Sequence, residues 1–136
     1  MVAVTVERLI ASYLDRLNLP YKHSPQRKLF IIQYVSKSGR EIPVMIYYSN
    51  KWIKFFVIAY NENDIPAYID RKILYRRLLE ENFYTYGVTF GITEKGSIIV
   101  EREVSTSSLR DVEIFRTYIL SVLSGMNYFI KEILKL

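Results

Sequence analysis

The only histidine, His23, is the first residue to consider as a catalytic group, because the chain contains no cysteine. A general base needs a group that orients it and a reacting group within hydrogen-bond reach. The surrounding stretch YKHSPQ supplies neither, and its other side chain that can carry a charge near neutral pH is Lys22. One histidine without any thiolate is also too few for a transition-metal site. We therefore interpret His23 as a loop residue and expect no catalytic residue and no metal ligand.

Two acidic pairs and a serine run are the remaining groups with chemical potential. Glu101 and Glu103 alternate on a predicted strand, and Glu62 and Asp64 flank a predicted helix start. A Mg²⁺ site would need such acids clustered in a pocket, so we interpret them as solvated side chains and helix-capping groups. The run STSS at 105–108 lacks the G-x-S-x-G context of a nucleophile elbow, and no glycine-rich phosphate loop is present. We expect a protein that is not an enzyme and binds no cofactor.

Length and composition fit one globular domain spanning residues 1–136. The chain is 50 % hydrophobic and 15 % aromatic, which excludes a disordered protein. The N-terminus has no basic leader followed by an apolar core, so no signal peptide is expected, and polar residues interrupt the apolar stretch 118–134, which argues against a membrane span. A cytoplasmic location follows as the default. Abundant Ile, Tyr, Lys and Glu without cysteine indicate a heat-adapted, thermophilic source.

The net charge of +5 is unevenly distributed, since residues 1–60 carry nine Lys/Arg and only three Asp/Glu. A basic surface could bind an anionic partner. The segment WIKFFVIAY places a lysine among aromatics, as in the sheet of an RNA-recognition module, although the order of helices and strands does not match that module. Nucleic-acid binding is therefore kept as an alternative function. Its candidate residues are Lys22, Arg27, Lys28, Arg40 and Lys54.

In the first half of the chain, a helix should precede three strands. Thr5 can cap a helix whose apolar residues recur at helical spacing until Asn18 and Pro20 end it. A basic loop should follow, and then β-branched and aromatic runs predict strands at 29–35, 41–48 and 52–60. Pro43 cannot donate to a strand ladder, so the second strand should lie at an edge or carry a bulge.

In the second half, a helix, a hairpin and a long helix are expected. Asp64 should cap the helix, which closes near Asn82, and residues 86–104 should form a hairpin around Gly96. Ser108 should cap a final helix of about 26 residues, in which Gly125 indicates a close helix–sheet contact or a kink. The predicted fold is α+β: a two-layer, mostly antiparallel five-stranded sheet with helices, in the order α-β-β-β-α-β-β-α.

This order resembles the type III secretion chaperone-like superfamily, which includes the YbjN-like proteins. The resemblance is carried by a helix ending in LLEEN, the strand YTYGVTFGI, a hairpin closed at TEKGSI, and VSTSSL leading into a long helix. The upstream helix and three strands extend it over nearly the whole chain. It implies a non-enzymatic domain that binds protein and commonly forms homodimers. The chain departs from such chaperones in charge, because they tend to be acidic and this one is basic.

The first three predicted strands carry bulky apolar residues on both faces. Helices can cover only one face, and large exposed apolar patches are uncommon on monomers, so the other face should bind a second molecule. Alternatively, the long C-terminal helix shields it. We expect a homodimer that acts as a chaperone or adaptor through a protein-binding set on the strands and the last helix: Met45, Tyr47, Trp52, Phe55, Tyr60, Tyr118 and Tyr128.

Overall fold

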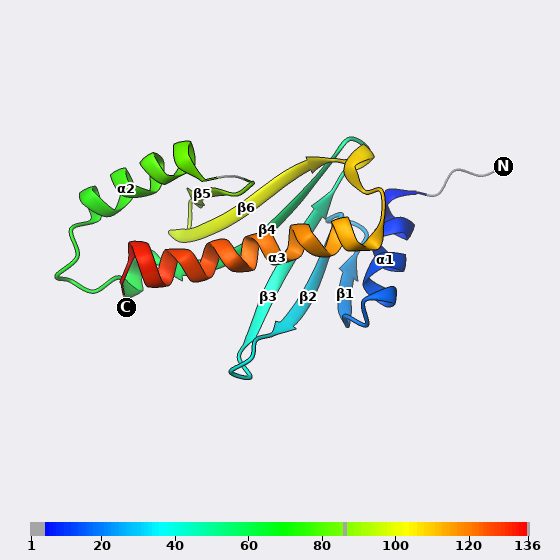
Figure 1. The fold of residues 1–136 in the computed structure, drawn as a ribbon, viewed down its shortest axis with the longest axis horizontal. Coiled ribbons are helices and arrows are strands. Elements are labelled where there is room, and N and C mark those ends of the chain that lie inside the picture. The colour runs from blue at the N-terminus through cyan, green and yellow to red at the C-terminus, as the bar shows by residue number, and fades with distance from the viewer. Residues whose placement is uncertain (1–4, 86, 136) are drawn as a thin grey trace. The chain divides into compact units, whose positions relative to one another are not determined.

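The computed structural model describes residues 5–85 and 87–135 and has the α+β class that the sequence predicts. The helical elements are α1 (Val6–Arg16), η1 (Glu62–Asp64), α2 (Arg71–Tyr84), η2 (Thr106–Ser108), α3 (Val112–Tyr128) and the π-helical turn η3 (Phe129–Ile133). The strands are β1 (Tyr21–Ser24), β2 (Leu29–Val35), β3 (Glu41–Tyr48), β4 (Trp52–Asn61), β5 (Thr89–Ile92) and β6 (Ser97–Ser105). They form one open antiparallel sheet in the order β1-β2-β3-β4-β6-β5 (Figure 1).

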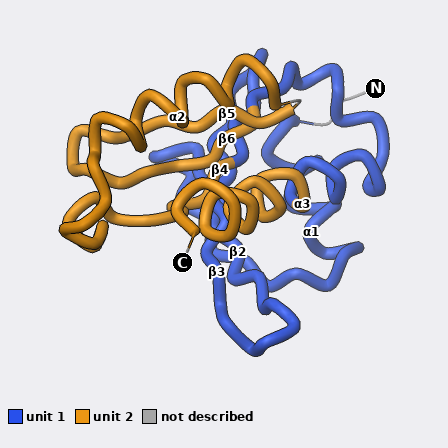
Figure 2. Tube along the Cα trace, turned by 60° about the vertical axis from the view of Figure 1, so that its left-hand side comes forward, with its two compact units in different colours: residues 1–55, 103–119 blue, residues 56–102, 120–136 orange. Residues whose placement is uncertain are grey.

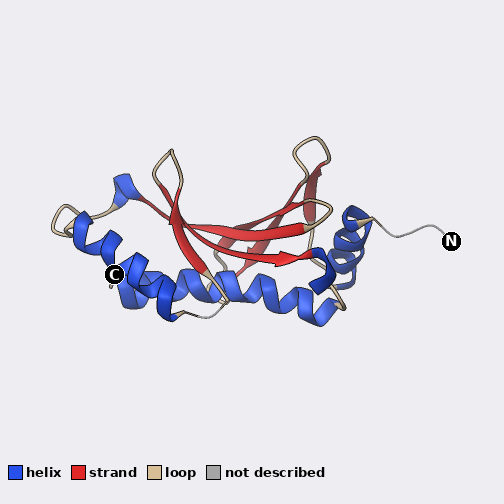
Figure 3. Cartoon of the chain, turned by 90° about the horizontal axis from the view of Figure 1, so that it is seen from above, coloured by secondary structure: helices blue, strands red, loops and turns tan. Residues whose placement is uncertain are grey.

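The chain divides into two compact units, each built from two segments (Figure 2). Unit 1 contains the chain up to residue 55 together with residues 103–119, and unit 2 contains residues 56–102 together with the chain from residue 120 onward. Three elements, β4, β6 and α3, contribute residues to both units. Short turns join β2 to β3, β3 to β4 and β5 to β6 (Figure 3).

Unit 1 has an aromatic core between its helices and strands. Phe115 of α3 lies 5.5 Å from Phe55 of β4 and 5.3 Å from Tyr13 of α1, measured between ring centroids. The Tyr13 hydroxyl donates to the carbonyl of Leu109 at 3.1 Å, so this buried phenol has a hydrogen-bond partner. The predicted cap of α1 is confirmed, because the Thr5 hydroxyl accepts from the amide of Arg8 at 3.2 Å.

Strand β1 corrects the prediction of a basic loop before the first strand. Residues Tyr21–Ser24 pair antiparallel with β2, so the described sheet has six strands where five were expected. The ring of His23 stacks on that of Phe30 at a centroid distance of 4.1 Å and an interplanar angle of 3°. His23 is therefore a strand residue held by packing, and its interpretation as a loop residue is wrong.

The expectation that Pro43 marks an edge strand is wrong, and Pro43 makes no bulge in the pairing of β3 with β2. Strand β3 lies between β2 and β4, and its pairing with β2 runs without interruption from Leu29↔Tyr47 to Val35↔Glu41. The amide of Tyr48 donates to the carbonyl of Lys28, on the β2 side. Because amide directions alternate along a strand, the missing N–H of Pro43 is on the side away from β2. The β2–β3 ladder consequently loses no hydrogen bond at the proline.

Unit 2 begins its main helix later than the sequence predicts. Residues 62–64 form the short helix η1, and α2 starts at Arg71 with Asp70 as its cap, the Asp70 carboxylate accepting from the amide of Lys72 at 2.9 Å. The expected cap, Asp64, lies outside α2. The segment before α2 is fixed by the Glu62 backbone, whose amide donates to Gly96 at 2.8 Å and whose carbonyl accepts from Arg71 at 3.0 Å.

The Asn82 side chain ties the end of α2 to β5, which is the last strand of the sheet. The Asn82 amide nitrogen donates to the carbonyl of Phe90 at 2.9 Å, and its oxygen accepts from the amide of Phe90 at 2.7 Å. Both backbone groups of an edge-strand residue are therefore satisfied by one side chain. The strand itself is shorter than predicted: it begins at Thr89, and residue 86 lies outside the described residues.

The last helix starts after its predicted cap and packs closely on the sheet. Asp111 caps α3 in place of Ser108, since its carboxylate accepts from the amide of Ile114 at 2.8 Å. A Cβ added to Gly125 would lie 2.6 Å from Cγ1 of Val100 in β6 and 3.3 Å from Cγ2 of Val88. The predicted close helix–sheet contact at Gly125 is thereby confirmed, and the hairpin glycine Gly96 has the positive φ of 83° that its turn requires.

Candidate protein-binding surface

In unit 1, the sheet face opposite α3 is apolar and accessible. Side chains alternate along β4, so Phe55 points to the helices while Trp52 and Lys54 point to the other face. Trp52 is 54 % exposed and Tyr47 is 40 % exposed. They line a pocket of about 240 Å³ with Lys54 and Glu103, whose ammonium and carboxylate lie 3.9 Å apart. We call Met45, Tyr47 and Trp52 the unit 1 face.

In unit 2, a second apolar surface follows the same alternation. Val57 and Ala59 of β4 are buried, whereas Ile58 is 49 % exposed and Phe56 is half-buried. Phe56 and Ile58 line a pocket of about 420 Å³ with Ile99 of β6, and the β5–β6 turn forms its polar rim. We call Phe56, Ile58 and Ile99 the unit 2 face. Each unit thus offers apolar side chains beside charged or polar ones.

The predicted protein-binding set is divided by the structure. Met45, Tyr47 and Trp52 share the unit 1 face, with Met45 half-buried. Phe55 is fully buried and packs against Phe115 and Tyr118, with the Tyr118 ring at 5.6 Å. Phe55 therefore belongs to the core and cannot contact a partner on this face. Its inclusion is corrected because neighbouring strand residues point to opposite sides.

Three members of that set remain. Tyr118 lies in unit 1 and is half-buried against Phe55, and its hydroxyl donates to the carbonyl of Ser108 at 3.5 Å. Tyr60 and Tyr128 lie in unit 2. The half-buried Tyr60 ring lies 6.4 Å from that of Phe129, and its hydroxyl donates to the carbonyl of Asp64 at 3.3 Å. The Tyr128 hydroxyl lies 3.2 Å from both carboxylate oxygens of Glu81. Neither tyrosine lines the pocket of the unit 2 face.

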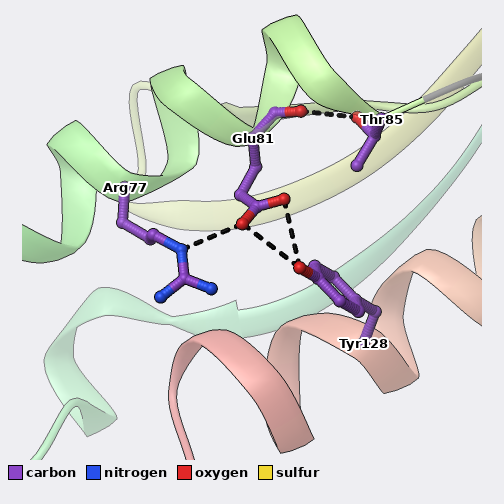
Figure 4. A network of polar contacts seen from close by, with 4 residues as sticks. All are labelled: Arg77, Glu81, Thr85 and Tyr128. Carbon is purple, nitrogen blue, oxygen red and sulfur yellow. Dashed lines mark hydrogen bonds and ion pairs between the residues drawn. The ribbon is translucent and has the colours of Figure 1, made fainter.

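Figure 4 shows the polar network around Glu81. Nε of Arg77 donates to Glu81 at 2.9 Å, and the hydroxyl of Thr85 donates to the Glu81 backbone carbonyl at 2.8 Å. The hydrogen bonds to Glu81 and Tyr128 raise the pKa of Arg77, which keeps this guanidinium charged. The network joins α2 to the C-terminal half of α3 and borders a pocket of about 320 Å³ lined by Phe90, Gly125 and Tyr128 among others.

His23 belongs to a polar cluster at the β1 end of the sheet. Its Nε2 lies 2.8 Å from the hydroxyl of Tyr48 and 3.4 Å from the carboxylate of Glu7 in α1. Burial first, and then the negative charge of Glu7, raise the pKa of the Tyr48 phenol. Packing against Phe30 and the contacts with Tyr48 and Glu7 explain the position of the His23 ring.

The basic residues named for nucleic-acid binding do not form one cluster. Lys22 lies on β1, and Arg27 and Lys28 lie in the turn between β1 and β2. Arg40 lies in the turn between β2 and β3, at the other end of β2 from Arg27 and Lys28. The ammonium of Lys54 approaches Glu103 on the sheet face. A groove that follows a phosphate backbone needs its charges side by side, and this arrangement does not provide them. Nucleic-acid binding remains an untested alternative.

Glu62, a member of one of the two acidic pairs, is held by a hydrogen bond from a tyrosine. The Glu62 carboxylate accepts from the hydroxyl of Tyr75 at 2.6 Å, and this hydrogen bond is the main cause of a raised pKa for Tyr75. Within residues 5–85 and 87–135, no three His, Asp or Glu side chains form a group that could hold a metal ion. None of the helices in those same ranges combines the length and apolar character needed to cross a bilayer.

The outer face of α2 is an apolar surface that the sequence reasoning missed. Only Leu74 and Leu78 of α2 are buried. Ile73, Leu79, Phe83 and Tyr84 are between 69 % and 82 % exposed. The signal available in the sequence was a second set of apolar residues at helical spacing, opposite Leu74 and Leu78.

Comparison with known proteins finds similar chains among solved structures and none by sequence. No family model matches the chain, and no curated protein matches it in sequence. A chain of the ExsC–ExsE complex superposes with a TM-score of 0.72 at 14 % identity, covering 94 % of this chain and 92 % of that one. A chain of the HopA1–SchA chaperone–effector complex gives a TM-score of 0.62 at 15 % identity, covering 88 % of each chain.

YbjN from E. coli is similar over a comparable length. Its structure superposes with a TM-score of 0.63 at 14 % identity, covering 97 % of this chain and 92 % of YbjN. At such low identity, the likeness concerns the path of the backbone. The resemblance predicted from the order of elements is confirmed at that level: this chain has the type III secretion chaperone-like, YbjN-like fold.

Proposed function

We propose that this protein is a non-enzymatic, chaperone-like domain that binds extended apolar segments of another protein and works as a homodimer. The observation that carries this proposal is the accessible apolar sheet face in each unit, centred on Trp52 in unit 1 and Ile58 in unit 2. Exposed patches of this kind mark interaction sites more often than inert surface. The fold supports the proposal, because two of the similar structures are a chaperone–effector complex and the ExsC–ExsE complex.

The physical mechanism is burial of apolar surface with a polar rim. An extended segment places alternate side chains on one side, at the spacing with which Trp52 and Lys54 alternate in unit 1 and Phe56 and Ile58 alternate in unit 2. Removing apolar area from water contributes roughly 25 cal/mol per Å², from which the cost of ordering the segment must be subtracted. Lys54 and Glu103 beside Trp52 offer charged contacts that orient the segment.

Trp52 provides a direct measurement, because it is the only tryptophan in the chain. Titration with a permanently unfolded, apolar-rich polypeptide should shift its emission to shorter wavelength as the indole leaves water. Tyr47→Asp and Ile58→Asp should each weaken binding by at least about 10-fold, since a charge is then buried against apolar groups. Ser38→Asp, in the exposed β2–β3 turn, is the matched control and should bind like the wild type.

Two outcomes would overturn the proposal. One is unchanged Trp52 emission with saturating unfolded polypeptide, and the other is equal affinity in all three aspartate variants. A parallel titration with single-stranded nucleic acid at low salt tests the alternative, because phosphate contacts are strongest there. Light scattering addresses the homodimer, which fails if the protein is monomeric at about 100 μM.

A further inference from the structure

The net charge of the protein belongs to one of its two units. Unit 1 contains eleven Lys/Arg and six Asp/Glu, whereas unit 2 contains eight of each, so unit 1 carries the whole net charge of +5. Within unit 1, residues 1–20 and 106–119 carry four charges of each sign. Residues 21–55 and 103–105 carry seven Lys/Arg and only two acids, Glu41 and Glu103. The positive excess is therefore a property of the sheet and its turns.

Strand register places one of these cations beside the apolar side chains of the unit 1 face. His23 pairs with Phe30 and stacks on its buried ring, on the side of the helices. The neighbouring residue Lys22 therefore points to the opposite side of the sheet. Lys22 pairs with Ile31, and Ile31 pairs with Met45, so these three side chains form one row on the unit 1 face. Lys22 is exposed and stands at the edge of the sheet, because β1 is a terminal strand.

Five further cations lie in the turns at the two ends of these strands. The β1–β2 and β3–β4 turns meet at one end, since the amide of Tyr48 donates to the carbonyl of Lys28 at 3.0 Å. These two turns contain Arg27, Lys28 and Lys51, and the β2–β3 turn at the other end contains Lys37 and Arg40. Among residues 5–85 and 87–135, no carboxylate forms an ion pair with Lys22 or with any of these five turn residues. Their charges are available to a partner.

We propose that the unit 1 face binds acidic apolar segments, which carry apolar side chains at alternate positions and aspartate or glutamate on either side of them. The inference rests on the proposed function and names the chemistry of the segment that is bound. Alternate side chains of an extended chain are about 7 Å apart, which is also the spacing of Met45 and Tyr47 along β3. The apolar side chains of the segment contact Met45, Tyr47 and Trp52, while its carboxylates reach the lysines and arginines at the border.

The arrangement of charge favours a peptide over a nucleic acid. The cations surround apolar side chains and do not line up in a continuous groove, which a phosphate backbone requires. Two acids stand on the same face: Glu41 pairs with Val35 across β2 and β3, and Glu103 lies 3.9 Å from Lys54. Phosphates passing over these carboxylates would be repelled, whereas a peptide can place an uncharged residue there.

The charges should give selectivity that depends on salt. Exposed ion pairs are individually weak, and salt screens them. Several such pairs around one apolar patch distinguish acidic from neutral segments, and they also accelerate association. We therefore expect apolar contacts with Tyr47 and Trp52 to hold any apolar segment, and the bordering cations to select the acidic ones.

Three labelled peptides test this preference. Each has leucine and phenylalanine separated by one serine at its centre, and they differ only in the four flanking residues, which are glutamate, glutamine or lysine. Fluorescence anisotropy at about 50 mM salt should show that the glutamate peptide binds at least about 10-fold more tightly than the glutamine peptide, and that the lysine peptide binds most weakly. At about 500 mM salt the three affinities should converge.

Charge reversal on the face, compared with the same reversal on the helices, locates the site. Lys22→Glu/Lys51→Glu should weaken binding of the glutamate peptide at least about 10-fold and should strengthen binding of the lysine peptide. That gain distinguishes a changed surface from a misfolded protein. Arg8→Glu/Arg116→Glu is the matched control, because it makes the same change in total charge at exposed positions of α1 and α3. The control should keep the wild-type preference.

The outcomes separate this inference from the proposed function. Equal affinities of the glutamate and glutamine peptides at about 50 mM salt, or equal losses in the two double variants, overturn the acidic preference and leave binding of apolar segments standing. A single-stranded oligonucleotide that binds more tightly than the glutamate peptide, and that loses affinity in Lys22→Glu/Lys51→Glu, assigns the face to nucleic acid and also overturns the inference. No binding of any peptide, with unchanged Trp52 emission on adding unfolded polypeptide, overturns the inference and the proposed function together.

Discussion

Trp52 and Phe55 lie three residues apart on β4 and have opposite environments. Phe55 is fully buried between the rings of Phe115 and Tyr118, whereas Trp52 is more than half exposed. Phe55→Ala should lower the free energy of unfolding by about 3–5 kcal/mol, because it leaves a cavity in the core of unit 1. Trp52→Ala should change it by no more than about 0.5 kcal/mol.

Urea unfolding followed by circular dichroism measures both variants. The comparison is informative because the two residues share one strand and both are aromatic. A large loss of stability in Trp52→Ala would mean that its side chain is covered by the chain itself, which contradicts an accessible unit 1 face. Phe55→Ala should in addition leave the urea dependence of the unfolding free energy unchanged if the folded area is preserved.

Tyr75 gives a pH dependence whose sign follows from its partner. The hydrogen bond to Glu62, then burial and then the Glu62 charge raise the pKa of Tyr75 above its usual 10.0. A folded-state pKa above the unfolded one contributes stability that is complete below the unfolded pKa and is lost as pH rises through the folded pKa. Tyr75→Phe should therefore cost stability near neutral pH and cost less well above 10.0.

Unfolding of the wild type and Tyr75→Phe at both pH values tests this sign. An alkaline difference spectrum between the two proteins should also show one phenol that ionises later than ordinary tyrosine. Tyr68→Phe is a suitable control, since Tyr68 is largely exposed. A stability difference that stays constant across the pH range would contradict the role of the Tyr75–Glu62 hydrogen bond.

At the scale of elements, the contact between α3 and β6 depends on the absence of a side chain at Gly125. Helix propensity alone would favour Gly125→Ala by roughly 1 kcal/mol. The added Cβ would lie 2.6 Å from Cγ1 of Val100, a β-branched side chain with little freedom to move. We expect a net destabilisation of about 1–3 kcal/mol, and partial recovery when Val100→Ala is added.

Thermal unfolding of Gly125→Ala, Val100→Ala and the double variant measures the coupling between the two positions. Ser124→Ala is the matched control, because Ser124 precedes Gly125 on the exposed side of the same helix. A stabilised Gly125→Ala protein would show that α3 can withdraw from the strand at no cost.

The sequence predicted the helices and strands whose apolar residues have a strong periodicity. It did not predict the elements whose position is decided by tertiary contacts. The alternation of 41–48 and 52–60 and the spacing of α1 predicted those elements correctly, whereas β1 has only four residues between two prolines and exists through its pairing with β2. Asp64 and Asp70 are equally suitable caps by residue type. The contacts of Glu62 with Gly96 and Arg71 hold the chain out of a helix until Asp70.

The sequence predicted only part of the candidate surface, and the rest was missed for a related reason. Strand alternation identified two apolar faces, but Phe55 was grouped with Trp52 by residue type, although their separation of three residues places them on opposite faces and Phe55 is in the core. On α2, apolar residues occur around much of the helix, and the sequence does not reveal that Ile73 faces solvent while Leu74 is buried. Burial depends on partners that are distant along the chain, and local patterns do not encode it.

At the scale of the whole molecule, we expect the two units to unfold together, as one domain spanning residues 1–136. The elements β4, β6 and α3 continue from one unit into the other, so neither unit can lose them without disrupting the second. Calorimetry should give one transition with an enthalpy near 95 kcal/mol, from about 0.7 kcal/mol per residue, and a van't Hoff enthalpy equal to it.

The measurement is best made at several protein concentrations, because any self-association would add a concentration dependence to the transition. Two resolved transitions, or a van't Hoff enthalpy well below the calorimetric one, would show that the units are independent domains. Phe55→Ala in unit 1 and Gly125→Ala in unit 2 should each shift the single transition, since a cooperative fold transmits both losses to the same midpoint.

The two hydrogen bonds between Asn82 and Phe90 bear on whether copies of this chain can add to one another through β5. A terminal strand with free backbone groups is a template for fibril growth, and here Asn82 occupies both backbone groups of Phe90 on β5. Asn82→Leu should therefore nucleate thioflavin-positive polymers faster than Thr89→Leu on the same strand. Resistance to fibril formation would then depend on one side-chain amide. By blocking strand addition at β5, this amide would keep the apolar sheet faces accessible.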